Sequence, residues 1–302
     1  MSFSSKVKEE IAGQTPSARH CQLAELSVII SNCSAMKTGQ GQNYLSVMLD
    51  KEPVKRKCFT LLRKTYNIEK AVEESNGELI LTEEDGLEEM LMGVGMLSKD
   101  GFRGFGEAID GRLIRNSCCK RAYLKGAFLA LGSMSDPQKG YHLEMVCSRE
   151  SMADQLVEVL SSFEIEAKII VRKKYHVVYI KEGSAIVDFL NVCEAHVSLM
   201  DFENLRILKE MSNSVNRRVN CETANIAKTV KASGRQIEDI LLIQRRYGFE
   251  RLPKGLKDIA EVRLEYPDAT LMELGELLDP PMGKSGVNHR LRKLSEIADG
   301  LR

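Results

Sequence analysis

The sequence predicts an α+β protein in two parts: a pseudo-twofold domain made of two copies of one α+β unit, followed by an all-α domain. Two observations predict this architecture. An apolar, small-residue-rich segment at 21–36 recurs at 119–134, and the same order of strand-like and helix-like patterns follows each copy. Strand-like alternation then fades after about residue 200. The length of 302 residues is typical of about two domains.

The first repeat, at about 1–100, should run helix, strand, helix, strand, strand, helix. The segment 21–36 is apolar on nearly every side, which is typical of a buried central helix. Residues 43–50 alternate as in a half-buried strand, and Asn76-Gly77 indicates a hairpin turn. The other expected elements are a helix at 54–66, hairpin strands at 68–73 and 78–82, and a helix at 85–97.

The second repeat, at about 101–200, follows the same order at an offset of about 97 to 101 residues, which places Leu23 on Leu124 and Tyr44 on Tyr141. Its expected elements are a helix at 119–134, a strand at 140–147, a helix at 149–163, hairpin strands at 167–172 and 176–181 around Lys173-Lys174, and a helix at 184–193. Small residues such as Gly126 permit the close helix approach that a central seam needs. The alternative interpretation is two unrelated α+β units.

The C-terminal part is predicted to be a linker helix within 201–220 and a helix-turn-helix domain over 221–302. Expected helices lie at 201–213, 221–244, 256–266, 271–278 and 285–298. Pro267 stops the third of these, and Ser285 is the expected N-cap of the last. A short helix, a tight turn and a second helix, preceded by other helices, are the plan of a helix-turn-helix domain.

The last predicted helix concentrates positive charge. Its apolar positions, Val287, Leu291, Leu294 and Ile297, share one face, while no acidic residue occurs between 282 and 293. The whole of 201–302 carries only +2, from 18 Lys+Arg and 16 Asp+Glu. Concentrated Lys and Arg suit phosphate contacts, and the helix N-terminal turn meets base edges. The candidate DNA-binding residues are Lys284, Ser285, Asn288, His289, Arg290, Arg292 and Lys293. The alternative is a solvated helix face.

Composition restricts the classes of function. Lys+Arg and Asp+Glu both number 43, which argues against a wholly basic nucleic-acid coat and an acidic tail. Trp is absent and aromatic residues make up 6%, which argues against broad base-stacking platforms. The N-terminal sequence MSFSSKVKEE lacks the apolar core of a signal peptide, and no apolar run reaches about 18 residues. We therefore expect a cytoplasmic, nucleoid-associated protein with no membrane partner.

The cysteines do not predict a metal site. All eight are scattered without a CxxC pair, and free thiols in a reducing cytosol are expected. The nearest approach to a metal half-site is Cys193-Glu-Ala-His196, which has no matching second half-site, whereas structural zinc needs four ligands. The sequence thus predicts no metal and no cofactor.

Three stretches resemble the WhiA family of bacterial transcription regulators. They are KRAYLKGAFLALGS at 120–133 with Ser135-Asp136-Pro137, RVNCETAN at 218–225, and LGELLDPP at 274–281 with KSGVNHRLRK at 284–293. The resemblance covers essentially the whole chain and is most specific in the last stretch. It implies a degenerate LAGLIDADG homing-endonuclease fold joined to a helix-turn-helix domain. It also implies a role in sporulation, cell division or chromosome segregation.

Because of this resemblance, a nuclease function can be tested by aligning the LAGLIDADG motif with the sequence. Active LAGLIDADG enzymes end each central helix in an acidic residue, and the pair binds the divalent metal for phosphodiester cleavage. Aligning that motif here places Ile30 and Leu131 at the acidic positions. Asp136 lies beyond the helix without a counterpart, and Glu25 falls at the motif's glycine position. No catalytic residues, and no enzyme, are therefore expected.

The main hypothesis is a transcription regulator that binds double-stranded DNA through its C-terminal domain. The alternative is a protein-interaction or ligand-binding scaffold whose endonuclease-like domain recruits another transcription regulator; a residual nuclease is a third possibility. Lys173-Lys174 and the basic residues Arg112, Arg115, Lys120 and Arg121 would suit a DNA-binding β saddle. The net charge of −2 over 1–200, from 25 Lys+Arg and 27 Asp+Glu, instead favours solvated surface positions.

Overall fold

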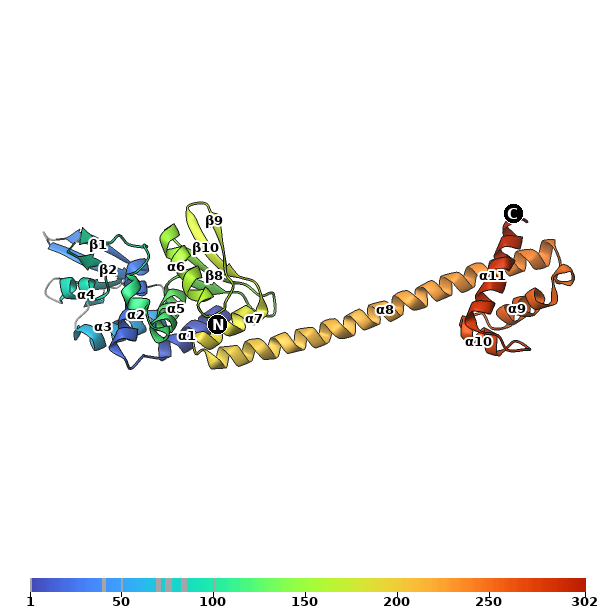
Figure 1. Cartoon of the computed structure of the whole chain (residues 1–302), viewed down its shortest axis with the longest axis horizontal. Coiled ribbons are helices and arrows are strands. Elements are labelled where there is room, and N and C mark those ends of the chain that lie inside the picture. Colours follow the sequence, from blue (N-terminus) through green and yellow to red (C-terminus); the bar gives the residue numbers. More distant parts are fainter. Residues whose placement is uncertain are drawn as a thin grey trace. The chain divides into compact units, whose positions relative to one another are not determined.

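The computed structural model describes residues 2–39, 42–49, 51–68, 72–73, 78–82, 86–99 and 101–302. The chain forms two compact units, unit 1 through Lys209 and unit 2 from Glu210 onward. Figure 1 shows unit 1 in blue to yellow and the end of unit 2 in red. The units divide inside a helix, later than the expected boundary at about residue 200.

The first half of unit 1 is a four-stranded antiparallel sheet with its helices. The strand order is β1-β2-β4-β3, and β1 pairs with β2 from Ser34↔Val47 to Gly39↔Gln42. The elements are α1 (Phe3–Gly13), α2 (Arg19–Cys33), β1 (Ser34–Gly39), β2 (Gln42–Met48), α3 (Glu52–Tyr66), β3 (Val72–Glu73), β4 (Glu78–Leu81) and α4 (Leu87–Gly93). The predicted turn at Asn76-Gly77 lies outside the described residues.

The second half of unit 1 repeats this topology. Its sheet has the order β7-β8-β10-β9, again antiparallel throughout. The elements are the small hairpin β5 (Leu97–Ser98) and β6 (Gly101–Phe102), the 3-10 helix η2 (Gly111–Ile114), α5 (Ser117–Leu131), β7 (Gly132–Met134), β8 (Leu143–Cys147), α6 (Glu150–Ser161), β9 (Lys168–Arg172), β10 (Tyr175–Ile180) and α7 (Gly183–Val192). The predicted pseudo-twofold α+β domain is confirmed.

Among the described residues, the four-stranded sheet of each repeat contains one strand more than predicted, and the small β5–β6 hairpin is a further addition. The central helices were expected to run to 36 and 134, but α2 ends at Cys33 and α5 at Leu131. The chain then enters β1 and β7 directly, and both strands pair with the strand that follows them. These segments are short, so their strand state depends on pairing with the strand that follows rather than on their own local pattern.

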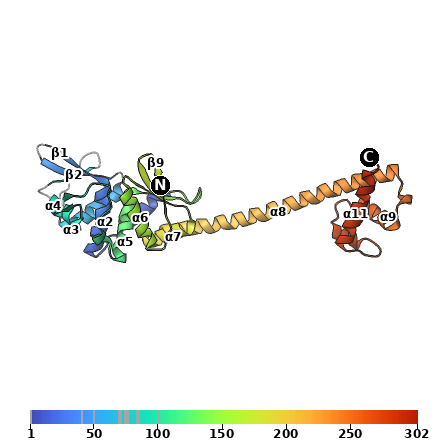
Figure 2. The same ribbon diagram turned by 45° about the horizontal axis from the view of Figure 1, so that its top comes forward.

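The two central helices, α2 and α5, pack closely at the middle of unit 1. They lie between the β1–β2 and β9–β10 hairpins in Figures 1 and 2. A Cβ atom at Gly126 would lie 2.6 Å from the Glu25 carbonyl oxygen and 2.5 Å from Val28 Cγ1. Glycine is therefore required at this crossing. The Glu25 side chain does not prevent close packing, because its carboxylate is directed to Lys57 of α3, 3.0 Å away.

Unit 2 is helical. Its elements are the last part of α8 (His196–Arg246), the 3-10 helix η3 (Phe249–Arg251), α9 (Lys254–Glu265), α10 (Leu271–Glu276) and α11 (Lys284–Asp299). Side chains of α8, α9, α10 and α11 share one core that includes Ile240, Ile259, Leu274 and Leu291. No described helix combines the length and apolar character that crossing a bilayer requires.

Helix α8 corrects the expected helices at 201–213 and 221–244, which are one continuous helix. The segment 196–246 contains no proline and a single glycine, Gly234, so nothing in it stops a helix. Residues 210–232 of α8 are exposed throughout, including the apolar Val215 and Ile226, and the unit 2 core contacts begin beyond them.

Candidate nucleic-acid interface

The helix-turn-helix of unit 2 consists of α10, a turn at 277–283, and α11. Helix α10 begins with a capping box: Thr270 N donates to Glu273 Oε2 at 2.7 Å, and Glu273 N donates to Thr270 Oγ1 at 3.4 Å. These hydrogen bonds from Thr270 hold the pKa of Glu273 below its usual value. The cap fixes where α10 starts, and therefore where the following turn lies.

The turn closes tightly against α10. Met282 N donates to the Gly275 carbonyl at 2.8 Å. A Cβ atom at Gly275 would lie 2.0 Å from the Met282 carbonyl oxygen, so any other residue would displace the turn. This contact directs the chain from α10 into α11 and sets the angle between the two helices.

Helix α11 has one buried face. Val287, Leu291, Leu294 and Ala298 are buried in the unit 2 core, and Ile297 is half-buried. The predicted apolar face is therefore present. The expected N-cap at Ser285 is wrong, however: Gly283 occupies the cap position with extended backbone, and Ser285 lies within the first helical turn. Its hydroxyl is consequently free to point outward rather than to close the helix.

Six of the seven candidate DNA-binding residues are exposed. They are Lys284, Ser285, Asn288, His289, Arg292 and Lys293. Among residues that the structure describes, none of the six has a hydrogen-bond or ion-pair partner. Positions 285, 288, 289 and 292 share the helical spacing of a single face, opposite the core. We call these six residues the α11 outer face.

Arg290 is separate from the α11 outer face. Its side chain is half-buried and turns toward α9, where Nη1 donates to the Gly255 carbonyl at 3.0 Å. A Cβ atom at Gly255 would lie 3.0 Å from the Arg290 guanidinium carbon, so glycine leaves room for this contact. Arg290 thus ties α11 to the start of α9.

Two further polar anchors hold the helices of unit 2, and the sequence did not reveal them. Arg263 is 2% exposed, and its Nη1 donates to the Ala269 carbonyl at 2.7 Å and the Pro267 carbonyl at 3.3 Å. Burial lowers the pKa of Arg263. Buried Asp239 of α8 accepts from Ser295 Oγ at 2.7 Å and pairs with Arg302 at 2.5 Å. These anchors position α11 without using its outer face.

In unit 1, the positions that are acidic in active endonucleases cannot bind a metal. Ile30 is fully buried and Leu131 is half-buried, and neither side chain has a ligand atom. Asp136 is exposed, and its Oδ1 accepts from Gln138 N at 2.9 Å in a turn. The described residues therefore hold no carboxylate pair at these helix ends.

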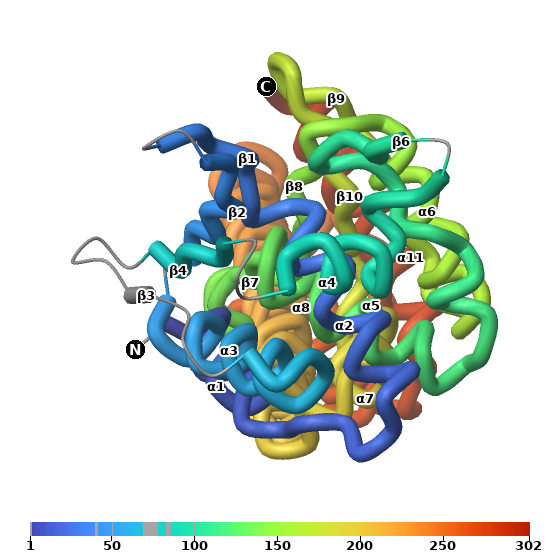
Figure 3. Tube along the Cα trace, turned by 90° about the vertical axis from the view of Figure 1, so that its left-hand side faces the viewer, coloured from blue at the N-terminus to red at the C-terminus, as the bar shows by residue number. Residues whose placement is uncertain are grey.

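The sheet side of unit 1 is a weaker candidate for DNA contact. Figure 3 shows the β1–β2 and β9 hairpins extending to one side, away from α1 and α7. Lys173 and Lys174 lie at the β9–β10 turn, as predicted, and are exposed. Arg172, beside this turn, contacts Glu144 at 3.1 Å, and Arg112, in η2, contacts Asp110 at 2.6 Å. Paired cations have less charge to offer phosphates.

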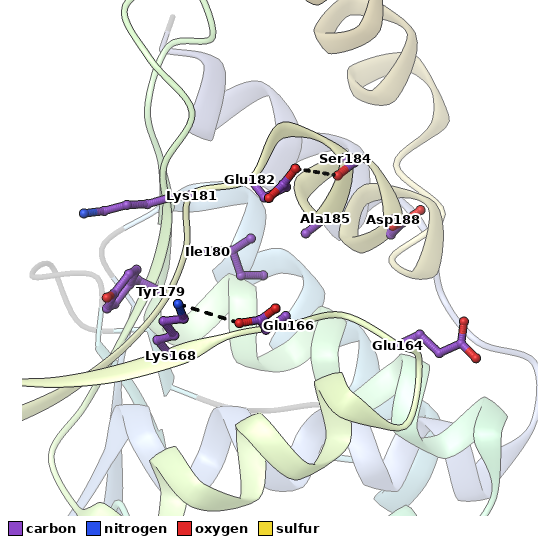
Figure 4. A pocket seen from close by; sticks show the side chains of 10 residues that line it. All are labelled: Glu164, Glu166, Lys168, Tyr179, Ile180, Lys181, Glu182, Ser184, Ala185 and Asp188. Carbon is purple, nitrogen blue, oxygen red and sulfur yellow. Dashed lines mark hydrogen bonds and ion pairs between the residues drawn. The ribbon is translucent and has the colours of Figure 1, made fainter.

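A hollow of about 470 Å³ beside β10 and α7 is acidic. Glu164, Glu166, Glu182 and Asp188 line it, and Figure 4 shows Lys168 directed to Glu166 and Lys181 extending away. The Lys168–Glu166 distance is 3.7 Å, and Ser184 Oγ lies 3.5 Å from Glu182. The excess of carboxylates makes this hollow unsuited to a phosphate.

The fold and the α11 outer face together define a protein in which a LAGLIDADG-like unit precedes a helix-turn-helix unit. Three family models match the chain in this order: the WhiA N-terminal LAGLIDADG-like domain at 19–77, the WhiA LAGLIDADG-like domain at 120–212, and the WhiA C-terminal HTH domain at 215–298. The chain belongs to the WhiA family.

Relatives and a solved structure agree with this assignment. A "Probable cell division protein WhiA" of Lachnoclostridium phytofermentans is 52% identical, with 100% of both chains covered. One of Clostridium perfringens is 44% identical over 100% of this chain and 99% of the relative. The crystal structure of full-length DUF199/WhiA from Thermatoga maritima is similar with a TM-score of 0.58 and 25% identity, covering 99% of this chain and 98% of that one.

Proposed function

We propose that this protein is a transcription regulator that binds double-stranded DNA through the α11 outer face and acts in cell division. The observation that supports this most directly is the set of exposed Lys, Arg, Asn and Ser side chains on the second helix of a helix-turn-helix, which have no partner within the part of the chain that the structure describes. The names of the relatives, probable cell division proteins, support the cellular role. Sporulation and chromosome segregation are the other roles that the family resemblance suggests.

The second helix of such a motif enters the major groove, and its N-terminal residues meet base edges. Asn288 lies one turn into α11, where its amide can donate to and accept from an adenine. Lys284, Arg292 and Lys293 then supply phosphate contacts, because their charges have no partner among the described residues. In this proposal base recognition comes from Asn288 and Ser285, and affinity from the basic side chains.

The test begins with DNA fragments recovered by genome-wide crosslinking of the full-length protein. Lys284→Ala, Arg292→Ala and Lys293→Ala should each weaken binding and reduce the slope of log K against log salt by about 0.9 per lost phosphate contact. Lys257→Ala is the matched control, because its ammonium is already paired with Glu250 at 3.3 Å and Glu261 at 3.9 Å. Unchanged affinity and slope in all three variants, with the fold intact, would contradict the proposal.

We also propose that unit 1 has no nuclease activity. Aliphatic Ile30 and Leu131 replace the paired carboxylates, so divalent metal has no ligands at these helix ends. The purified protein should leave its bound DNA uncut in Mg²⁺ or Mn²⁺. Metal-dependent cleavage that persists in Asp136→Asn would show that an active site lies elsewhere in the chain.

The second candidate function is a scaffold role of unit 1, which would recruit another transcription regulator. The pairing of Arg172 in β9 with Glu144 and the acidic hollow beside β10 and α7 favour a protein partner over DNA there. Localisation to the cytoplasm, in association with the nucleoid, is part of the same proposal. Comparison of DNA affinity for the full chain with and without Lys173→Ala/Lys174→Ala tests the division of labour. A loss as large as that of Arg292→Ala would assign DNA contact to unit 1 as well.

A further inference from the structure

Four potential metal ligands converge where the two central helices begin. His20 and Cys21 lie in the first turn of α2, and Cys118 and Cys119 lie in the first turn of α5. One ligand atom from each residue, a ring nitrogen or a thiol sulfur, lies within 4.8 Å of all the others. The pairs are nearly a hundred residues apart in the sequence, and the packing of α2 against α5 brings them together.

The spacing of these atoms is close to that of a tetrahedral zinc site. Zn–S bonds of about 2.3 Å and Zn–N bonds of about 2.0–2.1 Å imply S···N separations of about 3.6 Å and S···S separations of about 3.8 Å. Here His20 Nδ1 lies 3.1 Å from Cys119 Sγ and 3.3 Å from Cys21 Sγ. These two separations are a few tenths of an ångström shorter than the tetrahedral values, and the limit of 4.8 Å for the whole cluster exceeds them by about 1 Å, so side-chain adjustments of up to about 1 Å would place all four atoms around an ion.

The ligand types select the kind of metal. Three thiols and one imidazole favour zinc or another thiophilic transition metal, whereas Ca²⁺ and Mg²⁺ require oxygen ligands. Three thiolates around Zn²⁺ leave a net charge of −1. Arg121 lines the same hollow of about 430 Å³ as His20, Cys21 and Cys118 and can help to balance that charge, whereas Lys125, which also lines it, already pairs with Glu194 at 2.6 Å.

The burial of the four residues suits uptake of an ion from solution. Cys21 and Cys119 are buried, which fixes their positions within the helix packing, while His20 and Cys118 are exposed. An ion can therefore reach two ligands from solvent and complete its coordination on two that are held in place. The helix ends marked by Ile30 and Leu131 lie at the other end of α2 and α5 from this cluster.

We propose that His20, Cys21, Cys118 and Cys119 form a Cys₃His site for Zn²⁺ that links the N-terminal ends of the two central helices. The ion takes one ligand pair from each repeat and fastens the pseudo-twofold seam at this end. The site is independent of the α11 outer face.

The test uses the full chain, purified under reducing conditions without chelator. Elemental analysis should find about one zinc per chain. After removal of the metal, Co²⁺ titration should produce the absorption of tetrahedral thiolate-bound cobalt, with an end point near one equivalent, and Zn²⁺ should displace it. Added Zn²⁺ should also slow the reaction of the Cys118 thiol with a thiol reagent.

His20→Ala and Cys118→Ser alter the two exposed ligands and should preserve the fold, which circular dichroism would check. Both should weaken Co²⁺ binding at least tenfold and change the cobalt spectrum. Cys221→Ser, which removes an exposed cysteine on α8, is the matched control and should bind as the parent does. The proposal is wrong if the folded parent binds no Co²⁺ or Zn²⁺ near stoichiometry. It is equally wrong if folded His20→Ala and Cys118→Ser bind unchanged, or if the parent retains a Cys21–Cys118 disulfide in place of metal.

Discussion

Replacement of Arg290 by alanine should loosen unit 2 while leaving most DNA affinity intact. The Arg290 guanidinium donates to the Gly255 carbonyl at 3.0 Å and is half-buried against α9. Hydrogen bonds from a charged donor contribute about 1.5–3 kcal/mol when they are shielded from water. Partial exposure reduces this, so we expect Arg290→Ala to lower the free energy of opening α9 and α11 by about 1–2 kcal/mol.

Hydrogen exchange by mass spectrometry on the full chain measures this change locally. A loss of about 1–2 kcal/mol corresponds to exchange that is about 5 to 30 times faster in peptides from α9 and α11. Peptides from unit 1 should exchange at the parent rate and serve as an internal control. Arg292→Ala is the matched variant, because Arg292 is exposed on the same helix without a described partner. It should leave exchange unchanged and weaken DNA binding more than Arg290→Ala does.

Two results would refute this reasoning. If Arg290→Ala leaves the exchange of α9 and α11 unchanged, the contact with Gly255 contributes nothing to stability. If Arg290→Ala reduces DNA affinity and the salt slope as much as Arg292→Ala, the guanidinium leaves Gly255 to bind phosphate. In that case the separation of Arg290 from the α11 outer face does not persist on DNA.

Three further predictions concern unit 1. At about pH 8, above the raised pKa of Glu25, Glu25→Gln should destabilise it by about 3–5 kcal/mol, because Lys57 would remain buried without its counter-charge, and the double variant Glu25→Leu/Lys57→Met should recover most of the loss in urea unfolding. Burial raises the pKa of Glu25 from its ordinary 4.5 to about 7. At a pH between these two values, Glu25 is therefore protonated in the folded chain and ionised in the unfolded chain. The unfolding free energy should therefore fall as pH rises through this window, and Glu25→Gln should remove this dependence on pH. If the unfolding free energy of Glu25→Gln falls with pH as that of the parent does, another group is responsible. Gly126→Ala should cost about 1–2 kcal/mol, because overpacking against a carbonyl oxygen exceeds the gain in helix propensity. Gly13→Ala, with nothing within 4 Å, should be neutral or stabilising by up to about 1 kcal/mol; equal effects of the two variants would show that the seam relaxes freely.

The repeat could be predicted from sequence because each half must bury its own central helix. Segments 21–36 and 119–134 are apolar on nearly every side, and this requirement is visible without any long-range information. Strands β1 and β7 could not be predicted in the same way, because their state depends on pairing with β2 and β8. Local patterns predict two helices in the segment that forms α8, because each pattern covers only its own stretch, although no residue between 213 and 221 stops a helix.

The candidate interface was predictable as a set but not residue by residue. The basic run at 284–293 and the apolar spacing of α11 place six side chains on an outer face. Arg290 is equally basic in sequence, yet it lies on the α9 side of the helix, and only the position of Gly255 reveals its hydrogen bond. One feature of the sequence indicates the role of Arg263: it is a charged residue within an amphipathic helix that ends just before a proline, so it can bind carbonyl groups beyond the helix end.

The polar groups of the central seam lie in other positions than the carboxylates of the LAGLIDADG motif. An endonuclease needs carboxylates where the two helices end, and here those positions are Ile30 and Leu131. Charged groups instead lie nearer the beginning of the helices, where Lys57 pairs with Glu25 and also donates to the Gln14 carbonyl. Lys125 donates to Gln14 Oε1 at 2.8 Å and pairs with Glu194 at 2.6 Å.

This network includes residues from both repeats, as the proposed Cys₃His site beside it does. Neither set could be found by searching for ligands close together in sequence, because each forms only when α2 packs against α5. A weaker indication of the Cys₃His site is present in the sequence: Cys21 and Cys118-Cys119 lie in the first turns of the two central helices, which have equivalent positions in the two repeats. A pseudo-twofold fold brings equivalent ends together, so side chains at equivalent helix starts should be compared for shared chemistry before a metal site is excluded.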